Sequence, residues 1–136
     1  MKTLTPYLSF SGSCMQALEF YKEAFHGEII ATQTFGDAPM DIPADQKHRI
    51  LHSKFKAEGL HFFASDNMPG DEVRQGSQVS LTITLDNKEE QQAIFEKLAF
   101  GGNITMPLEK TFWGAIYGMV TDKFGMHWML NCEVAE

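Results

Sequence analysis

An internal repeat constrains this chain more than any other feature. The segments Gly59–Asp66 and Gly125–Cys132 both begin with a glycine, an apolar residue, a histidine, an aromatic residue and a second apolar residue. A further match places Ala24–Ile29 over Ala99–Ile104. These matches indicate two copies of one supersecondary unit, each about 65 residues long. The sequence therefore predicts a duplicated fold in which the two strands that carry the repeated motif line a shared site.

The first copy reads as a strand, a helix and three further strands. Alternation of polar and apolar residues predicts strands over residues 6–10, 28–35, 49–56 and 60–65. An apolar face at helical spacing predicts a helix over residues 14–25, with an N-cap from Ser11–Ser13 and its end at Gly27. Residues 36–47 contain two prolines and three aspartates and predict a loop.

The second copy repeats this order. Strands are predicted over residues 78–85, 104–108 and 115–121 and after the Phe124–Gly125 turn. A helix over residues 88–100 follows a cap at Asp86–Asn87, and Glu109–Gly114 reads as a loop. We expect one domain, residues 1–136, built from units at about 1–66 and 78–134 with a linker at 67–77.

Strand alternation also predicts which side chains face the helices. Leu8, Phe10, Ile83 and Leu85 should face the helices, whereas Tyr7, Ser9, Thr82 and Thr84 should face the other side of the sheet. On the third strand, Ser53 and Phe55 share one side, and His52, Lys54 and Lys56 share the other. Trp128 has the parity of Leu130 and should pack under a helix.

Composition excludes several classes of partner. The formal charge is -7 and the eleven basic residues are scattered, which argues against nucleic acid. No apolar run of about 18 residues is present, so we expect no membrane span. The two cysteines, Cys14 and Cys132, do not form a disulfide framework, and we expect free thiols in a cytoplasmic protein.

Several motifs together resemble the PhnB-like branch of the vicinal-oxygen-chelate superfamily, which includes glyoxalase I, bleomycin-resistance proteins and extradiol dioxygenases. They are Pro6–Gly12, Ala17–Tyr21, Ala64–Pro69, Thr111–Gly114 and Val120–Asn131. The resemblance implies an α+β fold in which two tandem βαβββ units form a cupped mixed sheet around a ligand cavity, and it implies a homodimer. Members often carry a demethylubiquinone methyltransferase label, but the chain has no Gly-rich S-adenosylmethionine loop after a parallel strand.

The resemblance also implies where metal ligands would lie in metal-dependent members. These positions hold Pro6 or Tyr7, Ser80, Phe63 and Met129, none of which is a good ligand for a divalent metal. We therefore expect neither a metal nor another cofactor.

Three histidines leave alternatives open. His61 and His127 share the strand parity of Phe63 and Met129 and should point into the barrel, and His52 lies on the third strand. They could be partly exposed histidines near turns, groups that bind a polar ligand or transfer protons, or an improvised metal site. Trp113, beside Gly114, could line the cavity or contact a second chain.

Two classes of function remain. The first is a metal-free protein that binds an aromatic or amphipathic small molecule, which the eleven phenylalanines favour. The alternative is a superfamily enzyme, a lyase or dioxygenase, with an altered metal site. Cys14 begins a helix, where the dipole could lower its pKa, but no positioned base accompanies it. The predicted ligand-binding residues are Tyr7, His52, His61, Phe63, Thr82, Trp113, His127 and Met129.

Overall fold

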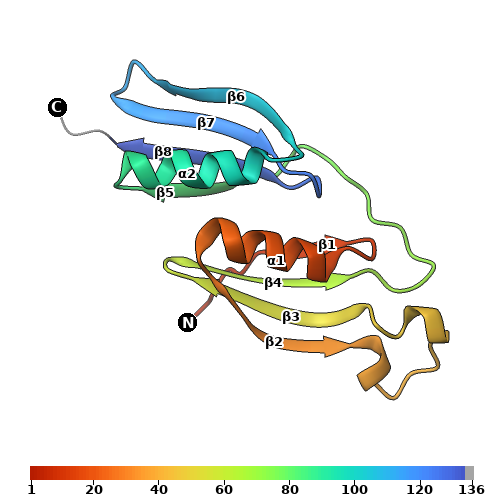
Figure 1. The fold of residues 1–136 in the computed structure, drawn as a ribbon. Helices are drawn as coiled ribbons and strands as arrows, with labels where there is room; N and C mark the ends of the chain where they lie inside the picture. The colour runs from red at the N-terminus through yellow and green to blue at the C-terminus, as the bar shows by residue number, and fades with distance from the viewer. Residues whose placement is uncertain (134–136) are drawn as a thin grey trace. The chain divides into compact units, whose positions relative to one another are not determined.

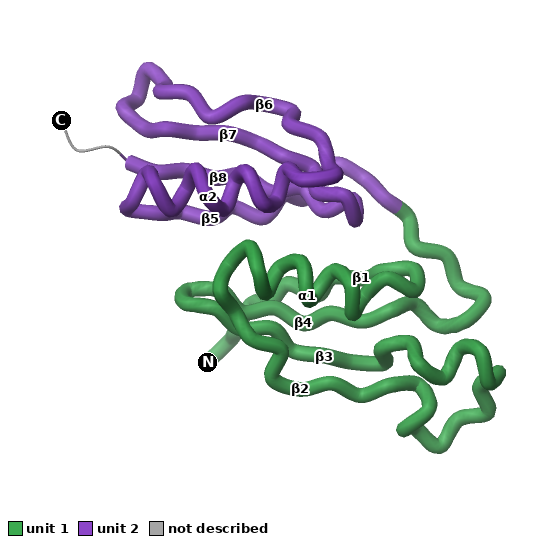
Figure 2. The backbone as a smooth tube through the Cα atoms, viewed as in Figure 1, with its two compact units in different colours: residues 1–74 green, residues 75–136 purple. Residues whose placement is uncertain are grey.

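The computed structural model describes residues 1–133 and shows two compact units, Met1–Arg74 and the chain from Gln75 onward (Figure 2). The boundary falls inside the segment 67–77 that we expected to be a linker. Residues 134–136, which include the predicted end of the second unit, lie outside the described residues. None of the helices in residues 1–133 is long and apolar enough to cross a membrane.

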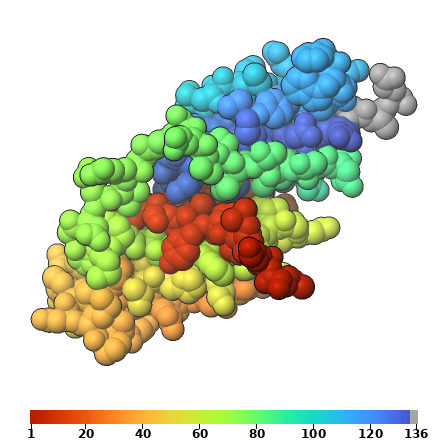
Figure 3. All heavy atoms as spheres, turned by 180° about the vertical axis from the view of Figure 1, so that it is seen from behind, coloured from red at the N-terminus to blue at the C-terminus, as the bar shows by residue number. Residues whose placement is uncertain are grey.

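Unit 1 has the predicted βαβββ order. Its elements are β1 (Tyr7–Phe10), α1 (Cys14–Phe25), β2 (Glu28–Thr34), β3 (Ile50–Ala57) and β4 (Leu60–Asp66). The sheet has the order β1-β4-β3-β2, and β1 is parallel to β4 while the other pairs are antiparallel. The segment between β2 and β3, orange in Figure 3, lies at the surface and contains two 3-10 turns, Phe35–Asp37 and Ala44–Gln46.

Unit 2 repeats the arrangement, which confirms the predicted duplication. Its elements are β5 (Leu81–Leu85), α2 (Lys88–Ala99), β6 (Asn103–Lys110), β7 (Ala115–Thr121) and β8 (His127–Glu133). The sheet has the order β5-β8-β7-β6, with β5 parallel to β8. In each unit the helix covers one face of its own four-stranded sheet (Figure 1).

Each core lies between the helix and the sheet. In unit 1 the rings of Phe55 and Phe62 stack with centroids 4.7 Å apart, and Tyr21 of α1 meets Phe62 edge-on at 5.8 Å. In unit 2 Trp128 is only 2% exposed and Leu130 is fully buried, in line with their predicted parity. The side chains that alternate with these residues along each strand therefore lie on the opposite face of the sheet.

Two strand boundaries differ from the prediction by more than one residue. β5 begins at Leu81 rather than residue 78, because its partner β8 begins at His127 and the pairing starts with Leu81 opposite Trp128. β6 continues to Lys110, where a loop was expected, because it stays paired with β7 as far as Ile116. β6 is an edge strand of its sheet, and an edge position tolerates the missing N–H of Pro107.

The start of α1 is capped differently from the prediction. The Ser13 side chain makes no capping hydrogen bond. Instead, Oδ1 of Asp66 accepts from the backbone N–H of Gly12 (2.8 Å) and of Cys14 (3.0 Å), and Oδ2 accepts from Ile50 N–H (2.9 Å). Asp66 is 5% exposed, so one buried carboxylate ties the helix to the starting end of β3. In α2, by contrast, Asn87 caps locally as predicted, through Glu90 N–H at 2.8 Å.

The glycines after the helices serve packing. His26, not Gly27, adopts the left-handed conformation at the end of α1, with φ 52°. A Cβ on Gly27 would lie 2.8 Å from the carbonyl oxygen of Lys56. A Cβ on Gly102, which follows α2, would overlap the backbone of Thr121. Both positions therefore require glycine because the chain passes against a strand of its own sheet.

Candidate functional site

A group of aromatic and basic side chains gathers on the face of the unit 1 sheet that α1 does not cover. It consists of Tyr7 from β1, His52 and Lys54 from β3, and His61 and Phe63 from β4, and we call it the Phe63 cluster. The strand registers bring these residues together, because Tyr7 and Lys54 both lie directly opposite Phe63, on the two strands that flank β4.

Phe63 is the centre of the cluster. Its ring centroid lies 5.2 Å from that of His61, at an interplanar angle of 86°, and 5.3 Å from that of His52. Tyr7 meets Phe63 edge-on at 6.1 Å. Nζ of Lys54 lies 5.8 Å from the Phe63 centroid, within cation–π distance. Three of the eight predicted site residues therefore lie around the ring of a fourth, Phe63.

The hydroxyl and imidazole groups of the cluster can donate or accept hydrogen bonds. The Tyr7 hydroxyl is hydrogen-bonded to Nδ1 of His52 at 3.3 Å, and the tautomer of the imidazole decides which group donates. Tyr7 is 49% exposed, so its hydroxyl can also reach a ligand. An aromatic surface with hydroxyl, imidazole and ammonium groups around it suits a ligand that is partly apolar and partly polar.

Lys54 was not among the predicted site residues, although the sequence carried a signal for it. Strand alternation already placed Lys54 on the same side as His52. What the sequence lacked was the cross-strand register that sets Lys54 opposite Phe63.

The corresponding face of unit 2 has a different chemistry. Thr82 lies opposite Met129, and its hydroxyl is 3.6 Å from the Met129 sulfur. Nδ1 of His127 is hydrogen-bonded to the Thr121 hydroxyl at 2.9 Å, and its Nε2 lies 2.6 Å from the Gly76 carbonyl oxygen. Both ring nitrogens of His127 thus have partners inside unit 2, whereas the ring of its repeat counterpart His61 packs against Phe63.

Trp113 lies in the turn between β6 and β7 and is 58% exposed. Its ring meets Tyr117 edge-on at 6.1 Å and Phe112 at 4.9 Å. Tyr117 is opposite Asn131 on β8, so Trp113 lies beside the same face as Met129. Tyr117 is a further aromatic residue at this face and was not predicted as a site residue.

The side chains at the implied metal positions do not form a metal centre. Among residues 1–133, no three His, Cys, Asp or Glu side chains are grouped so that they could hold a metal ion. The strand registers pair Tyr7 with Phe63 and Thr82 with Met129, so Thr82, rather than Ser80, is the counterpart of Tyr7. A phenol, a phenyl ring, a hydroxyl and a thioether are a poor donor set for a divalent metal.

The cysteines are not activated thiols. Burial, together with the negative charge of Asp66, raises the pKa of Cys14 to about 12, although a hydrogen bond with Ser53 opposes this shift. The expectation that the helix dipole could lower this pKa is therefore wrong. Burial also raises the pKa of Cys132, and Asp86 and Glu89 add to the effect. Both thiols are free and buried.

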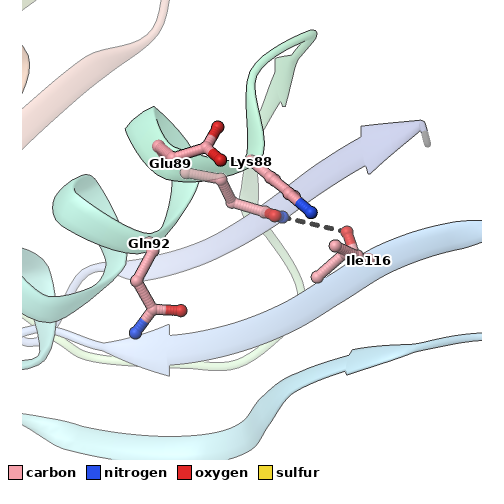
Figure 4. A pocket seen from close by; sticks show the side chains of 5 residues that line it. Lys88, Glu89, Gln92 and Ile116 are labelled. Atoms are coloured by element: carbon pink, nitrogen blue, oxygen red, sulfur yellow. Dashed lines mark hydrogen bonds between the residues drawn. The ribbon is translucent and has the colours of Figure 1, made fainter. Parts of the chain in front are cut away.

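An open pocket of about 370 Å³ lies elsewhere, between the start of α2 and β7 (Figure 4). Lys88, Glu89, Gln91, Gln92 and Ile116 line it. The Gln91 side chain donates to the Ile116 carbonyl oxygen at 2.9 Å, which joins the helix to the sheet. This pocket contains none of the predicted site residues and lies on the helix-covered side of its sheet.

The fold is that of the glyoxalase and bleomycin-resistance proteins of the vicinal-oxygen-chelate superfamily. The FosX fosfomycin resistance protein of Listeria monocytogenes has this fold at a TM-score of 0.67, with 16% identity over 98% of this chain and 92% of that chain. Within the superfamily, residues 2–131 match the family model described as 3-demethylubiquinone-9 3-methyltransferase. The chain belongs to this PhnB-like family, as its motifs predicted.

Three relatives illustrate the similarity. Protein YjdN of Escherichia coli is 33% identical over 94% of this chain and 93% of its own length. The crystal structure of PA1353 from Pseudomonas aeruginosa has a TM-score of 0.88 and 39% identity, and covers 98% of both chains. A putative 3-demethylubiquinone-9 3-methyltransferase, PhnB protein, from Bacillus cereus has a TM-score of 0.82 and 27% identity over 96% of this chain and 99% of that chain.

Proposed function

We propose that this PhnB-like protein binds an aromatic or amphipathic small molecule without a metal, and that the Phe63 cluster forms part of the binding surface. The observation that carries the proposal is the convergence of Tyr7, His52 and His61 on the ring of Phe63. Aromatic rings supply contact area, and the hydroxyl and imidazole groups orient a polar substituent of the ligand. The Thr82, His127, Met129 and Trp113 side chains are proposed as ligand contacts of unit 2.

The methyltransferase activity in the family's description is not part of the proposal. A common site for a nucleotide-type cofactor is a Gly-rich loop between a strand and a helix, where free backbone N–H groups bind the cofactor. Here the loop between β1 and α1 is Ser11–Ser13, and the N–H groups of Gly12 and Cys14 are already bonded to Asp66. These two N–H groups are therefore not available to an anionic group of a cofactor.

Binding can be tested with a simple aromatic probe, 2-naphthamide, in equilibrium dialysis. We expect Phe63→Ala to weaken binding at least about fivefold, because a buried aromatic contact contributes roughly 1 kcal/mol or more. Phe100→Ala is the matched control, since Phe100 is 74% exposed and lies outside the Phe63 cluster. Equal affinity of the Phe63→Ala and unmodified proteins, or no binding at all, would contradict the proposal.

The second candidate function is that of a lyase or dioxygenase of the superfamily with an altered site. The Tyr7–His52 hydrogen bond favours it, because a phenol and an imidazole can relay a proton. Elemental analysis of the purified protein separates the two functions. One equivalent of metal per chain, lost in His61→Ala or His127→Ala, would overturn the metal-free proposal.

We also propose that the protein is a cytoplasmic homodimer. The proposal rests on the family's usual assembly and on the exposed aromatic turn at Phe112 and Trp113. Light scattering after size-exclusion chromatography should give twice the chain mass of 15.3 kDa. A mass of one chain at micromolar concentration would reject the dimer.

A further inference from the structure

The Phe63 cluster carries a positive charge that its cross-strand neighbours do not neutralise. The residues directly opposite Lys54 are Phe63 on β4 and Ala31 on β2, and neither is charged. Lys56, two residues further along β3, differs because Glu28 lies directly opposite it. Of these two lysines, Lys54 is therefore the one whose ammonium group can pair with a charge from outside the chain.

The other polar groups around Phe63 also favour an anionic ligand. The His61 imidazole can donate a hydrogen bond to an anionic oxygen, and so can either the Tyr7 hydroxyl or the His52 imidazole, depending on the His52 tautomer. The ammonium group of Lys54 lies 5.8 Å from the Phe63 centroid, so an anion that contacts it also lies close to the aromatic surface. The whole chain carries a net charge of -7, which makes a basic and aromatic surface on it distinctive.

We infer that the Phe63 cluster selects an aromatic carboxylate, whose ring packs on Tyr7 and Phe63 while the carboxylate pairs with Lys54. This inference rests on the proposed binding function and adds the charge of the ligand. An aromatic cation would be repelled by Lys54, and a neutral amide could accept a hydrogen bond from Lys54 but would lack the attraction between two opposite full charges. Because the ion pair is near the surface, we expect a preference of about fivefold rather than a thousandfold.

The test compares 2-naphthoate with 2-naphthamide, which have the same ring and nearly the same shape but differ in charge. Equilibrium dialysis at low salt should give an affinity about fivefold higher for naphthoate. Lys54→Met keeps the length of the side chain and should abolish this preference, while the affinity for naphthamide stays within about twofold. Lys22→Met is the matched control, because Lys22 is an exposed lysine on α1, on the other side of the unit 1 sheet, and should leave the preference unchanged.

The outcomes separate this inference from the proposed function. If both probes bind equally and Phe63→Ala weakens both, the binding function stands and the anion preference is wrong. A preference that survives in Lys54→Met also refutes the inference, because another group then selects the charge. If neither probe binds, both the binding function and the inference fail. Circular dichroism of Lys54→Met and Lys22→Met must match the unmodified protein for the comparison to count.

Discussion

Removal of the Asp66 carboxylate should destabilise unit 1 more than any other single truncation of a polar side chain in that unit. Asp66 accepts three backbone N–H bonds of 2.8, 3.0 and 2.9 Å and is almost completely buried. The first turn of α1 contains no acidic residue, so Asp66 is also the carboxylate that complements the helix dipole.

The size of the effect follows from the three donors. Each buried N–H left without an acceptor costs about 1–3 kcal/mol, and partial entry of water reduces the sum. We expect Asp66→Ala to lower the free energy of unfolding by about 3–5 kcal/mol. Asp66→Asn should lower it by about 2 kcal/mol, because one oxygen can still accept while the amide group faces a donor.

Urea unfolding followed by far-UV circular dichroism measures the loss. Both tryptophans, Trp113 and Trp128, belong to unit 2, so fluorescence monitors that unit separately. Thiol labelling of Cys14, which is fully buried, reports on unit 1. Asp41→Ala, in the exposed loop after β2, is the control and should change stability by less than about 0.5 kcal/mol. A loss below about 1 kcal/mol for Asp66→Ala, with Cys14 still protected, would refute the reasoning.

Three further predictions concern local features. Cys14 should resist iodoacetamide at pH 8 in the folded protein, because its pKa is raised to about 12, and rapid labelling at pH 8 would contradict this expectation. Raising the pH above about 9 should lower the free energy of unfolding, since the thiol ionises more readily in the unfolded chain. His26→Gly should raise stability by about 0.5–1 kcal/mol, seen as a higher Tm, because glycine adopts the left-handed conformation without strain, and a lower Tm would count against it. Gly102→Ala should cost about 1–3 kcal/mol in urea unfolding, because its Cβ would lie 2.9 Å from Cα of Asp122, while Gly76→Ala, with open space around it, should cost little.

Local pattern was enough to predict most of the fold. Alternation and helical spacing depend on neighbouring residues, and the α1 range Cys14–Phe25 was predicted without error. The same reasoning identified which side of β1 faces α1, since Leu8 and Phe10 are buried while Tyr7 and Ser9 are not. Errors arose at β5 and β6, where a partner strand decides the boundary.

Features that depend on distant partners could not be predicted. The hydrogen bonds of Asp66 reach Gly12 and Cys14, more than fifty residues earlier in the chain, and no local pattern indicates them. Likewise, parity placed His61 and His127 on equivalent faces, but it could not show that Nε2 of His127 lies 2.6 Å from the carbonyl oxygen of Gly76. Alternation assigns a side chain to a face, whereas its partner depends on register and on loops.

The duplicated units show how one backbone supports two different surfaces. Tyr7 opposite Phe63 in unit 1 corresponds to Thr82 opposite Met129 in unit 2, so the parallel strand register is the same while the side chains differ. The repeated histidine differs in the same way, because the ring of His61 packs against Phe63 while both nitrogens of His127 are bonded within its own unit. A ligand that uses rings and charge should therefore depend on unit 1 side chains more strongly than on their unit 2 counterparts. Substitution of Phe63 should consequently weaken binding more than the equivalent substitution of Met129.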